Sequence, residues 1–173
     1  IHHTELSISM FLFGFALGQL CFGPLSDRLG RKPVLLSGLV VFMLASLMIT
    51  TADSLTSLLV WRFIQALGGG ACVVNSAAIV RDCFSGREAA KVMSTMAMIM
   101  MLAPLVAPAV GSLLLHIAGW WLIFVFLAVY AGFLFWLLGT RLPETRDINL
   151  PAASPRQVIR NYASVLRHKE GMG

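Results

Sequence analysis

Charged residues are scarce in this chain. They make up 12% of its 173 residues, whereas hydrophobic residues make up 58%, and soluble domains carry roughly 25% charged residues. A soluble core could not bury so much apolar surface, so most side chains are expected to face lipid. The net charge of +5 does not indicate nucleic-acid binding, because the basic residues gather at the ends of apolar runs and not on one polar face.

Patterns typical of catalysis and metal binding are absent as well. The sequence contains no nucleophile–base constellation, no Walker loop and no metal-ligand spacing. Its cysteines, Cys21, Cys72 and Cys83, have neither disulfide nor metal spacing, and we interpret them as small apolar side chains. These absences argue against an enzyme and against an ATP-driven pump, and they predict neither a metal nor a cofactor.

Five long apolar runs dominate the sequence. Each is about 20 residues long, enough for a helix to cross a ~30 Å hydrocarbon core. Backbone groups in lipid must be satisfied within the segment, which favours helices. The predicted fold class is therefore an all-α membrane protein, with spans at residues 6–25, 33–52, 56–80, 89–115 and 120–140.

Basic residues predict the orientation of these spans. Of the 13 Lys and Arg residues, all but Arg62 lie in the loops after the first and third spans or in the tail after the fifth. The alternate loops, near Asp53 and His116, have none, so the positive-inside rule makes the basic loops cytoplasmic. The chain then begins outside, and a six-helix unit with both ends inside needs one helix before Ile1.

The tail differs from the spans. Ser154-Pro155 is typical of a helix start, and apolar residues recur at helical spacing after it. This pattern predicts an amphipathic helix over residues 155–168 on the membrane surface, while a loosely ordered linker fits the same residues equally well. We expect residues 1–141 to form a partial helical bundle and residues 142–173 to begin a cytoplasmic loop.

A compact charged run, Gly-Pro-Leu-Ser-Asp-Arg-Leu-Gly-Arg-Lys, occupies residues 23–32 between the first two spans. Gly23 and Pro24 are expected to end the first span, and Gly30 to permit a tight turn. Asp27 is suited to accept hydrogen bonds from a helix N-terminus.

Arg28 and Arg31 can pair with acids at neighbouring helix ends, and Asp82, beside Arg81, is the nearest candidate. The residues alone leave open whether this cluster moves during function or only marks topology.

The pattern G-x-L-x-D-R-x-G-R-K resembles the signature loop of the major facilitator superfamily, which joins helices two and three of a twelve-helix transporter. The resemblance implies a major facilitator fold in which this loop gates the cytoplasmic side during alternating access. The residues that it assigns to the gate, with their expected partners, are Gly23, Asp27, Arg28, Gly30, Arg31, Lys32, Arg81 and Asp82.

A second constellation lies inside the third span. Arg62 and Gln65 share one side of the predicted helix, and Asn75 adds a polar group further along. The glycines at residues 68–70 are expected to permit close helix approach. An arginine at a helix centre costs ~2.5–3.5 kcal/mol on insertion scales, so Arg62 is either paired structurally with another helix or faces a cavity. This run resembles the superfamily's helix-four motif, linked to proton coupling, with Ala66 in place of a glycine.

The fourth span carries a small-residue stripe with two prolines. Spacing alone fits either a generic packing groove or a kinked helix. The run resembles the superfamily's helix-five antiporter motif, with alanine and serine at two glycine positions, and this resemblance favours export over uptake. The residues concerned are Ala103, Pro104, Ala107, Pro108 and Gly111.

Met93, Met96 and Met100 recur on one face of the same span. Flexible thioethers suit surfaces that bind varied apolar ligands, although methionines facing lipid or the core are the commoner case.

The chain as a whole is similar to the bicyclomycin, chloramphenicol and multidrug-resistance (Bcr/CflA) subfamily. That resemblance implies a proton-coupled antiporter that exports small hydrophobic drugs across the inner membrane. Its partners would be protons, the lipid bilayer, a missing first helix and a C-terminal bundle. No acid lies inside the five predicted spans, so the proton carrier is expected elsewhere. An uptake symporter for a small polar solute and an inactive or non-transporting membrane protein remain as alternatives.

Overall fold

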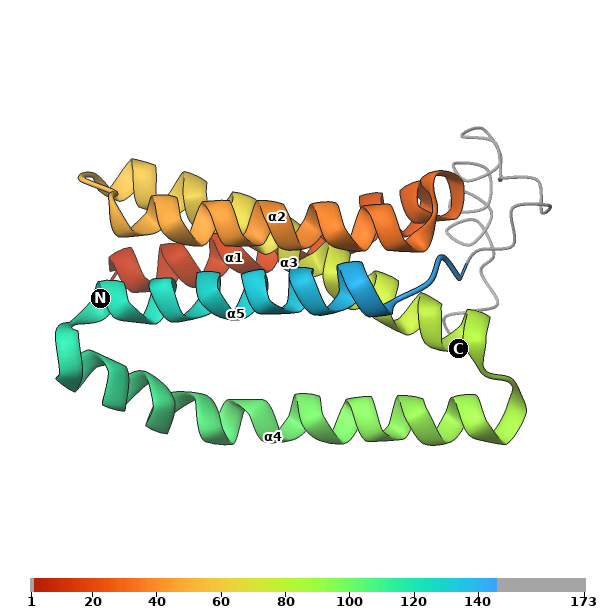
Figure 1. The fold of residues 1–173 in the computed structure, drawn as a ribbon. Coiled ribbons are helices and arrows are strands. Elements are labelled where there is room, and N and C mark those ends of the chain that lie inside the picture. The colour runs from red at the N-terminus through yellow and green to blue at the C-terminus, as the bar shows by residue number, and fades with distance from the viewer. Residues whose placement is uncertain (1, 146–173) are drawn as a thin grey trace, which may run out of the picture.

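The computed structural model describes residues 2–145, and these residues form five long helices joined end to end (Figure 1). All five are long and apolar enough to cross a membrane. The predicted all-α membrane fold is therefore confirmed. The helices are α1 (His2–Leu29), α2 (Arg31–Thr50), α3 (Leu55–Cys83), α4 (Gly86–Ala118) and α5 (Trp120–Arg141). The predicted tail helix at residues 155–168 lies outside the described residues.

Very short connections make adjacent helices antiparallel. Gly30 alone separates α1 from α2, and Gly119 alone separates α4 from α5. Their φ angles are 104° and 96°, a backbone region that glycine adopts readily and other residues avoid. At the start of α3, the Ser54 side chain accepts a hydrogen bond from the Ser57 amide and caps the helix.

The helices extend past most of the predicted span limits. The expectation that Gly23 and Pro24 end the first span is wrong, because α1 continues through both residues to Leu29. The spans were drawn over apolar residues alone, whereas a helix continues into polar sequence until its backbone turns. Locally, the Ser26 hydroxyl donates to the Gly23 carbonyl in the preceding turn at 2.8 Å.

The centre of the bundle is α3, which packs along both α1 and α2, while α5 packs against α2 (Figure 1). Glycines allow these contacts. A Cβ atom built on Gly70 would lie 2.5 Å from the Phe15 carbonyl oxygen of α1, and one on Gly68 would lie 2.6 Å from the Gly38 carbonyl oxygen of α2. The predicted role of this glycine run in close helix approach is confirmed for Gly68 and Gly70, whereas a Cβ atom on Gly69 would make only ordinary contacts.

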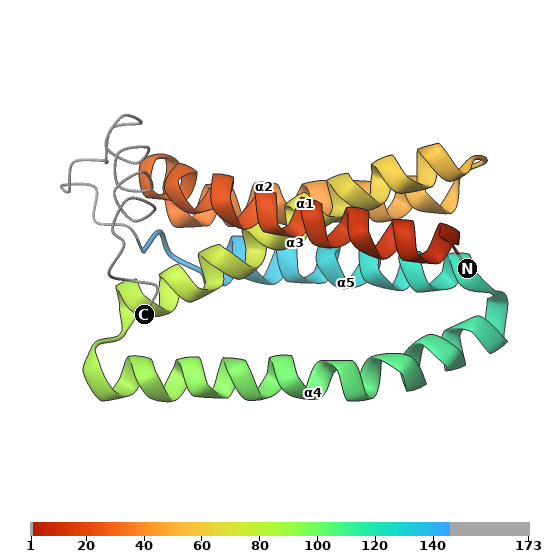
Figure 2. The same cartoon turned by 180° about the vertical axis from the view of Figure 1, so that it is seen from behind.

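Helix α4 lies apart from the other four (Figures 1 and 2), and it has no buried residue. Its second half curves toward the start of α5 (Figure 2). Pro104 and Pro108 lie inside this helix, where each lacks a backbone donor and favours bending. Across the bundle, large apolar side chains such as Phe13, Met101 and Trp136 are exposed, as expected of helices that face lipid.

Candidate functional site

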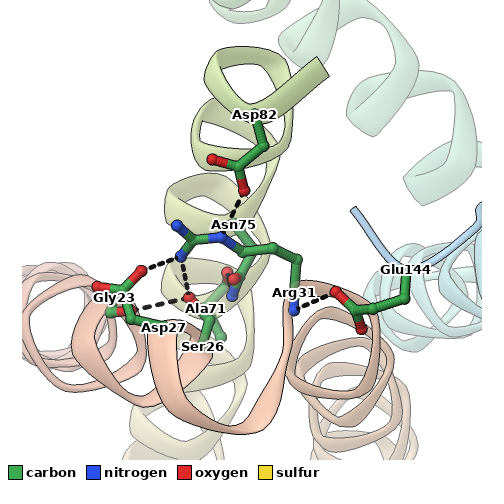
Figure 3. A network of polar contacts seen from close by, with 8 residues as sticks. All are labelled: Gly23, Ser26, Asp27, Arg31, Ala71, Asn75, Asp82 and Glu144. Atoms are coloured by element: carbon green, nitrogen blue, oxygen red, sulfur yellow. Dashed lines mark hydrogen bonds and ion pairs between the residues drawn. The ribbon is translucent and has the colours of Figure 1, made fainter. Parts of the chain in front are cut away.

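The charged run between α1 and α2 forms a compact polar cluster, which we call the basic-end cluster: Ser26, Asp27, Arg31, Asp82 and Glu144. It lies at the end of the bundle where α1, α3 and α5 finish (right side of Figure 1; close-up in Figure 3). Arg31 is its hub. Its guanidinium pairs with Asp27 at 2.6 Å and with Asp82 of α3 at 2.9 Å. The predicted pairing of Arg31 with Asp82 is present.

Ser26 completes the shell around the Arg31 side chain. Its hydroxyl is fully buried and accepts a hydrogen bond from Nη1 of Arg31 at 2.7 Å. The Arg31 side chain is only 15% exposed, whereas the Asp27 side chain is 50% exposed. Charge-assisted hydrogen bonds of this kind are the stronger ones in proteins, so α1 and α3 are joined here through one partly buried guanidinium.

Glu144 was not identified from the sequence as a site residue. Its carboxylate accepts hydrogen bonds from the backbone amides of Arg31 at 2.9 Å and Lys32 at 3.2 Å (the first is drawn in Figure 3). Gly30, the N-cap of α2, supplies no side-chain cap, so Glu144 caps α2 from beyond the end of α5. In return, Nζ of Lys32 donates to the Gly139 carbonyl in the last turn of α5 at 2.9 Å.

This reciprocal capping satisfies both helix dipoles. An anion stabilises the N-terminus of α2, and a cation stabilises the C-terminus of α5. Asp27, expected at a helix N-terminus, pairs with the Arg31 side chain instead. The remaining members of the predicted gate, Arg28 and Arg81, lie in the last turns of α1 and α3, at the same end of the bundle.

The second polar group, which we call the Arg62 cluster, lies on α3 nearer the opposite end of the bundle. Arg62 donates to Oε1 of Gln65 at 3.0 Å, and Nε2 of Gln65 donates to the Ser46 hydroxyl of α2 at 2.8 Å. Ser46 in turn donates to the Phe42 carbonyl at 2.7 Å. Gln65 and Ser46 are fully buried, so this chain satisfies polar groups that burial would otherwise destabilise.

Two aromatic rings flank the half-buried Arg62. Its Cζ atom lies 4.8 Å from the centroid of the Phe11 ring of α1 and 5.6 Å from that of the Phe124 ring of α5. Among residues 2–145, no carboxylate forms an ion pair with Arg62. The sequence identified Arg62 and Gln65 as candidate site residues. It did not identify their partners from other helices, which are Ser46, Phe11 and Phe124.

Asn75 does not join the Arg62 cluster. It lies further along α3, toward the end of this helix that carries Asp82 (Figure 3). Its side-chain amide donates to the Ala71 carbonyl at 2.8 Å, and its Oδ1 atom is buried without a partner among the described residues.

The predicted small-residue stripe and the predicted methionines lie on α4 but make few contacts with the other described helices. A Cβ atom built on Gly111 has nothing within 4 Å, so the stripe of Ala103, Ala107 and Gly111 packs against no other described helix there. Met93 and Met96 are half-buried and Met100 is exposed.

A hollow of about 460 Å³ lies against the first half of α4, beyond the end of α3. Met96 lines it, together with Glu88 and Lys91. It is therefore a mixed polar and apolar surface, and of the three predicted methionines it includes only Met96.

Geometry and composition together define the class: a multi-pass helical membrane protein with a charged cluster at one end and an arginine among apolar helices. The family model of the Major Facilitator Superfamily matches residues 2–170. The chain belongs to this superfamily, which confirms the family resemblance, and the members of this superfamily are secondary transporters and not enzymes.

Curated relatives cover almost the whole chain. It is 35% identical to the bicyclomycin resistance protein homolog of Haemophilus influenzae over 100% of the chain and 43% of that protein. It is 39% identical to the chloramphenicol resistance protein of Pseudomonas aeruginosa over 82% of the chain and 34% of that protein. It is 32% identical to the multidrug transporter MdfA of Yersinia pestis over 98% of the chain and 41% of that protein. The chain therefore spans less than half the length of these relatives.

Proposed function

We propose that this chain forms helices two to six of the N-terminal bundle in a proton-coupled antiporter that exports small hydrophobic drugs across the inner membrane. The observation that carries the proposal is Arg62, a cation held among apolar helices by Gln65 and two aromatic rings. A membrane-embedded charge is costly and is a functional-site hypothesis by default. The relatives named for bicyclomycin, chloramphenicol and multidrug resistance supply the substrate class.

In this mechanism the Arg62 cluster serves proton coupling and the basic-end cluster serves gating. Arg62 tunes a proton relay. Within the described helices acids occur only at the helix ends, so the acidic proton carrier lies outside these helices. The basic-end cluster gates the cytoplasmic side, because Arg31 joins α1 to α3 through Asp27 and Asp82. Breaking or forming these pairs changes how closely the helix ends approach as the two bundles rock around a central site.

Drug accumulation tests the role of Arg62. Cells expressing the full-length parent accumulate little drug, and we expect the R62A variant to accumulate much more at equal amounts of folded protein, checked by size-exclusion chromatography. The R87A variant is the matched control, because Arg87 is an exposed arginine in the first turn of α4. Unchanged efflux by R62A would refute the proposed role of Arg62.

The direction of transport separates export from uptake. Pro104 and Pro108 favour an antiporter, so in inverted vesicles an imposed pH gradient, acidic inside, should drive drug into the lumen. Movement of a polar solute together with protons would instead support an uptake symporter of the same fold. Residues 1–173 alone should not transport in liposomes, since alternating access requires two bundles.

Thiol labelling tests the proposed orientation. Cys83 is exposed at the end of α3, near the basic-end cluster. With Cys21 and Cys72 replaced by alanine, a membrane-impermeant maleimide should label Cys83 in inverted vesicles and not in intact cells. Labelling from outside the cell would overturn the cytoplasmic placement of the basic loops.

A further inference from the structure

The position of Arg62 between two aromatic rings is not explained by the motif that contains it. One ring, Phe11, comes from α1 and the other, Phe124, from α5. We call Arg62 and these two rings the clamp, and it joins two helices to α3. Both ring centroids lie within the ~6 Å at which a cation is attracted to the negative face of an aromatic ring. Phe11 also stacks on Phe15, and Phe124 makes an edge contact with Trp120, so neighbouring rings brace both.

The rings supply a kind of stabilisation that a carboxylate does not. A guanidinium carries five N–H donors, and residues 2–145 give Arg62 one hydrogen bond, to Gln65, and no carboxylate. The aromatic faces favour the cation without neutralising it. Arg62 is therefore held in place while its charge and its remaining donors stay available to an anionic group.

We propose that Phe11 and Phe124 are positioning residues that hold the Arg62 guanidinium between α1 and α5 for proton-coupled transport. The inference rests on the proposed role of Arg62 and adds how that role depends on helix separation. Because each ring belongs to a different helix, any movement of α1 or α5 relative to α3 changes a ring-to-guanidinium distance and so changes how firmly Arg62 is held.

Fluorinated phenylalanines test this proposal in the full-length transporter. Adding one, two or three fluorine atoms to a ring keeps its shape nearly constant while weakening the negative potential of its face. We expect efflux driven by a pH gradient to fall about twofold with each fluorine at Phe11 or Phe124. A purely packing role would leave the rate unchanged along the series.

Matched controls separate ring electronics from ring size. Phe126 lies on the same helix as Phe124 but is 46% exposed and has no contact with Arg62 among the described interactions, so fluorination there should have no effect. The F124W variant should retain efflux and the F124L variant should lose it, because Trp is the stronger cation-binding ring. A flat fluorine series at both Phe11 and Phe124 would overturn the proposal even if R62A abolishes efflux.

A stability measurement tests the clamp independently of transport. In the wild-type background, trifluorination at Phe124 should lower the melting temperature of the purified transporter by about 2–4 °C. In the R62M background, where the side chain is unbranched but uncharged, the same fluorination should cause no shift. Equal shifts in the two backgrounds would refute the clamp. A charge-dependent shift without proton-coupled efflux would instead refute the proposed function and leave the clamp standing.

Discussion

Gly70 offers the sharpest test of how the bundle is held together. In the G70A variant the new Cβ atom would lie 2.5 Å from the Phe15 carbonyl oxygen and 3.0 Å from the Gln19 amide nitrogen, whereas ordinary contact begins at 3.4 Å. The three nearest atoms all belong to the backbone of α1, so rotating a side chain cannot relieve the contact. Helices α1 and α3 would have to separate by nearly an ångström.

The energetic cost follows from that separation. Overpacking a close-packed interior destabilises by roughly 1–3 kcal/mol, and alanine recovers up to about 1 kcal/mol over glycine within a helix. We expect G70A to lose about 1–2 kcal/mol of unfolding free energy, and G70V to lose more because its two methyl groups need further space.

Thermal unfolding of the full-length transporter in detergent measures this loss. For a cooperative unit of about 150–250 residues, such as one helical bundle, 1 kcal/mol corresponds to a shift of roughly 2–4 °C. The matched control is G139A, since a Cβ atom there meets nothing within 4 Å. Its stability should stay the same or rise slightly. If G70A melts at the temperature of G139A, the backbone contact between α1 and α3 does not limit stability and the reasoning fails.

Three further predictions concern the polar clusters. In an S26C background, D82N should weaken the pair with Arg31 and raise the reactivity of the introduced thiol toward a thiol reagent, because the Arg31 side chain that covers this position is held less firmly. E144A should lower the unfolding free energy by about 1 kcal/mol, as for a lost N-cap, and speed hydrogen exchange at the Arg31 amide. Q65L should cost about 1–3 kcal/mol, because it leaves the buried Ser46 hydroxyl without its donor, and thermal unfolding measures that loss.

Each of these predictions has an outcome that would contradict it. Unchanged thiol reactivity in D82N would show that Asp82 does not restrain Arg31. Hydrogen exchange at Arg31 as slow in E144A as in the wild type would remove Glu144 as the cap of α2. A Q65L variant as stable as the wild type would show that the chain from Gln65 to Ser46 contributes little.

The sequence predicted the features that depend on local patterns. Long apolar runs specify membrane helices because lipid leaves no other partner for the backbone, and glycines at residues 68–70 predicted close packing around α3. The ion pair between Arg31 and Asp82 also followed, since short turns bring the ends of α1 and α3 to the same side.

Features that depend on the relative position of distant segments were not predictable. Glu144 caps α2 from more than a hundred residues away, and a Pro-Glu-Thr sequence after an apolar run gives no local sign of its partner. The aromatic neighbours of Arg62 are two among 11 phenylalanines, and only the packing angles of α1 and α5 select them. The end of α1 was misplaced because Pro24 lies where the helix leaves the apolar run but not where it stops.

The glycine contacts along α3 also have a mechanical consequence. Arg62 and Asp82 lie twenty residues apart on this helix, about 30 Å along its axis. Between them, Gly68 and Gly70 hold the backbone of α3 directly against α2 and α1, with no intervening side chains to deform. These close contacts couple the three helices where they cross, so a tilt of α3 at the level of Arg62 also moves the end of α3 that carries Asp82.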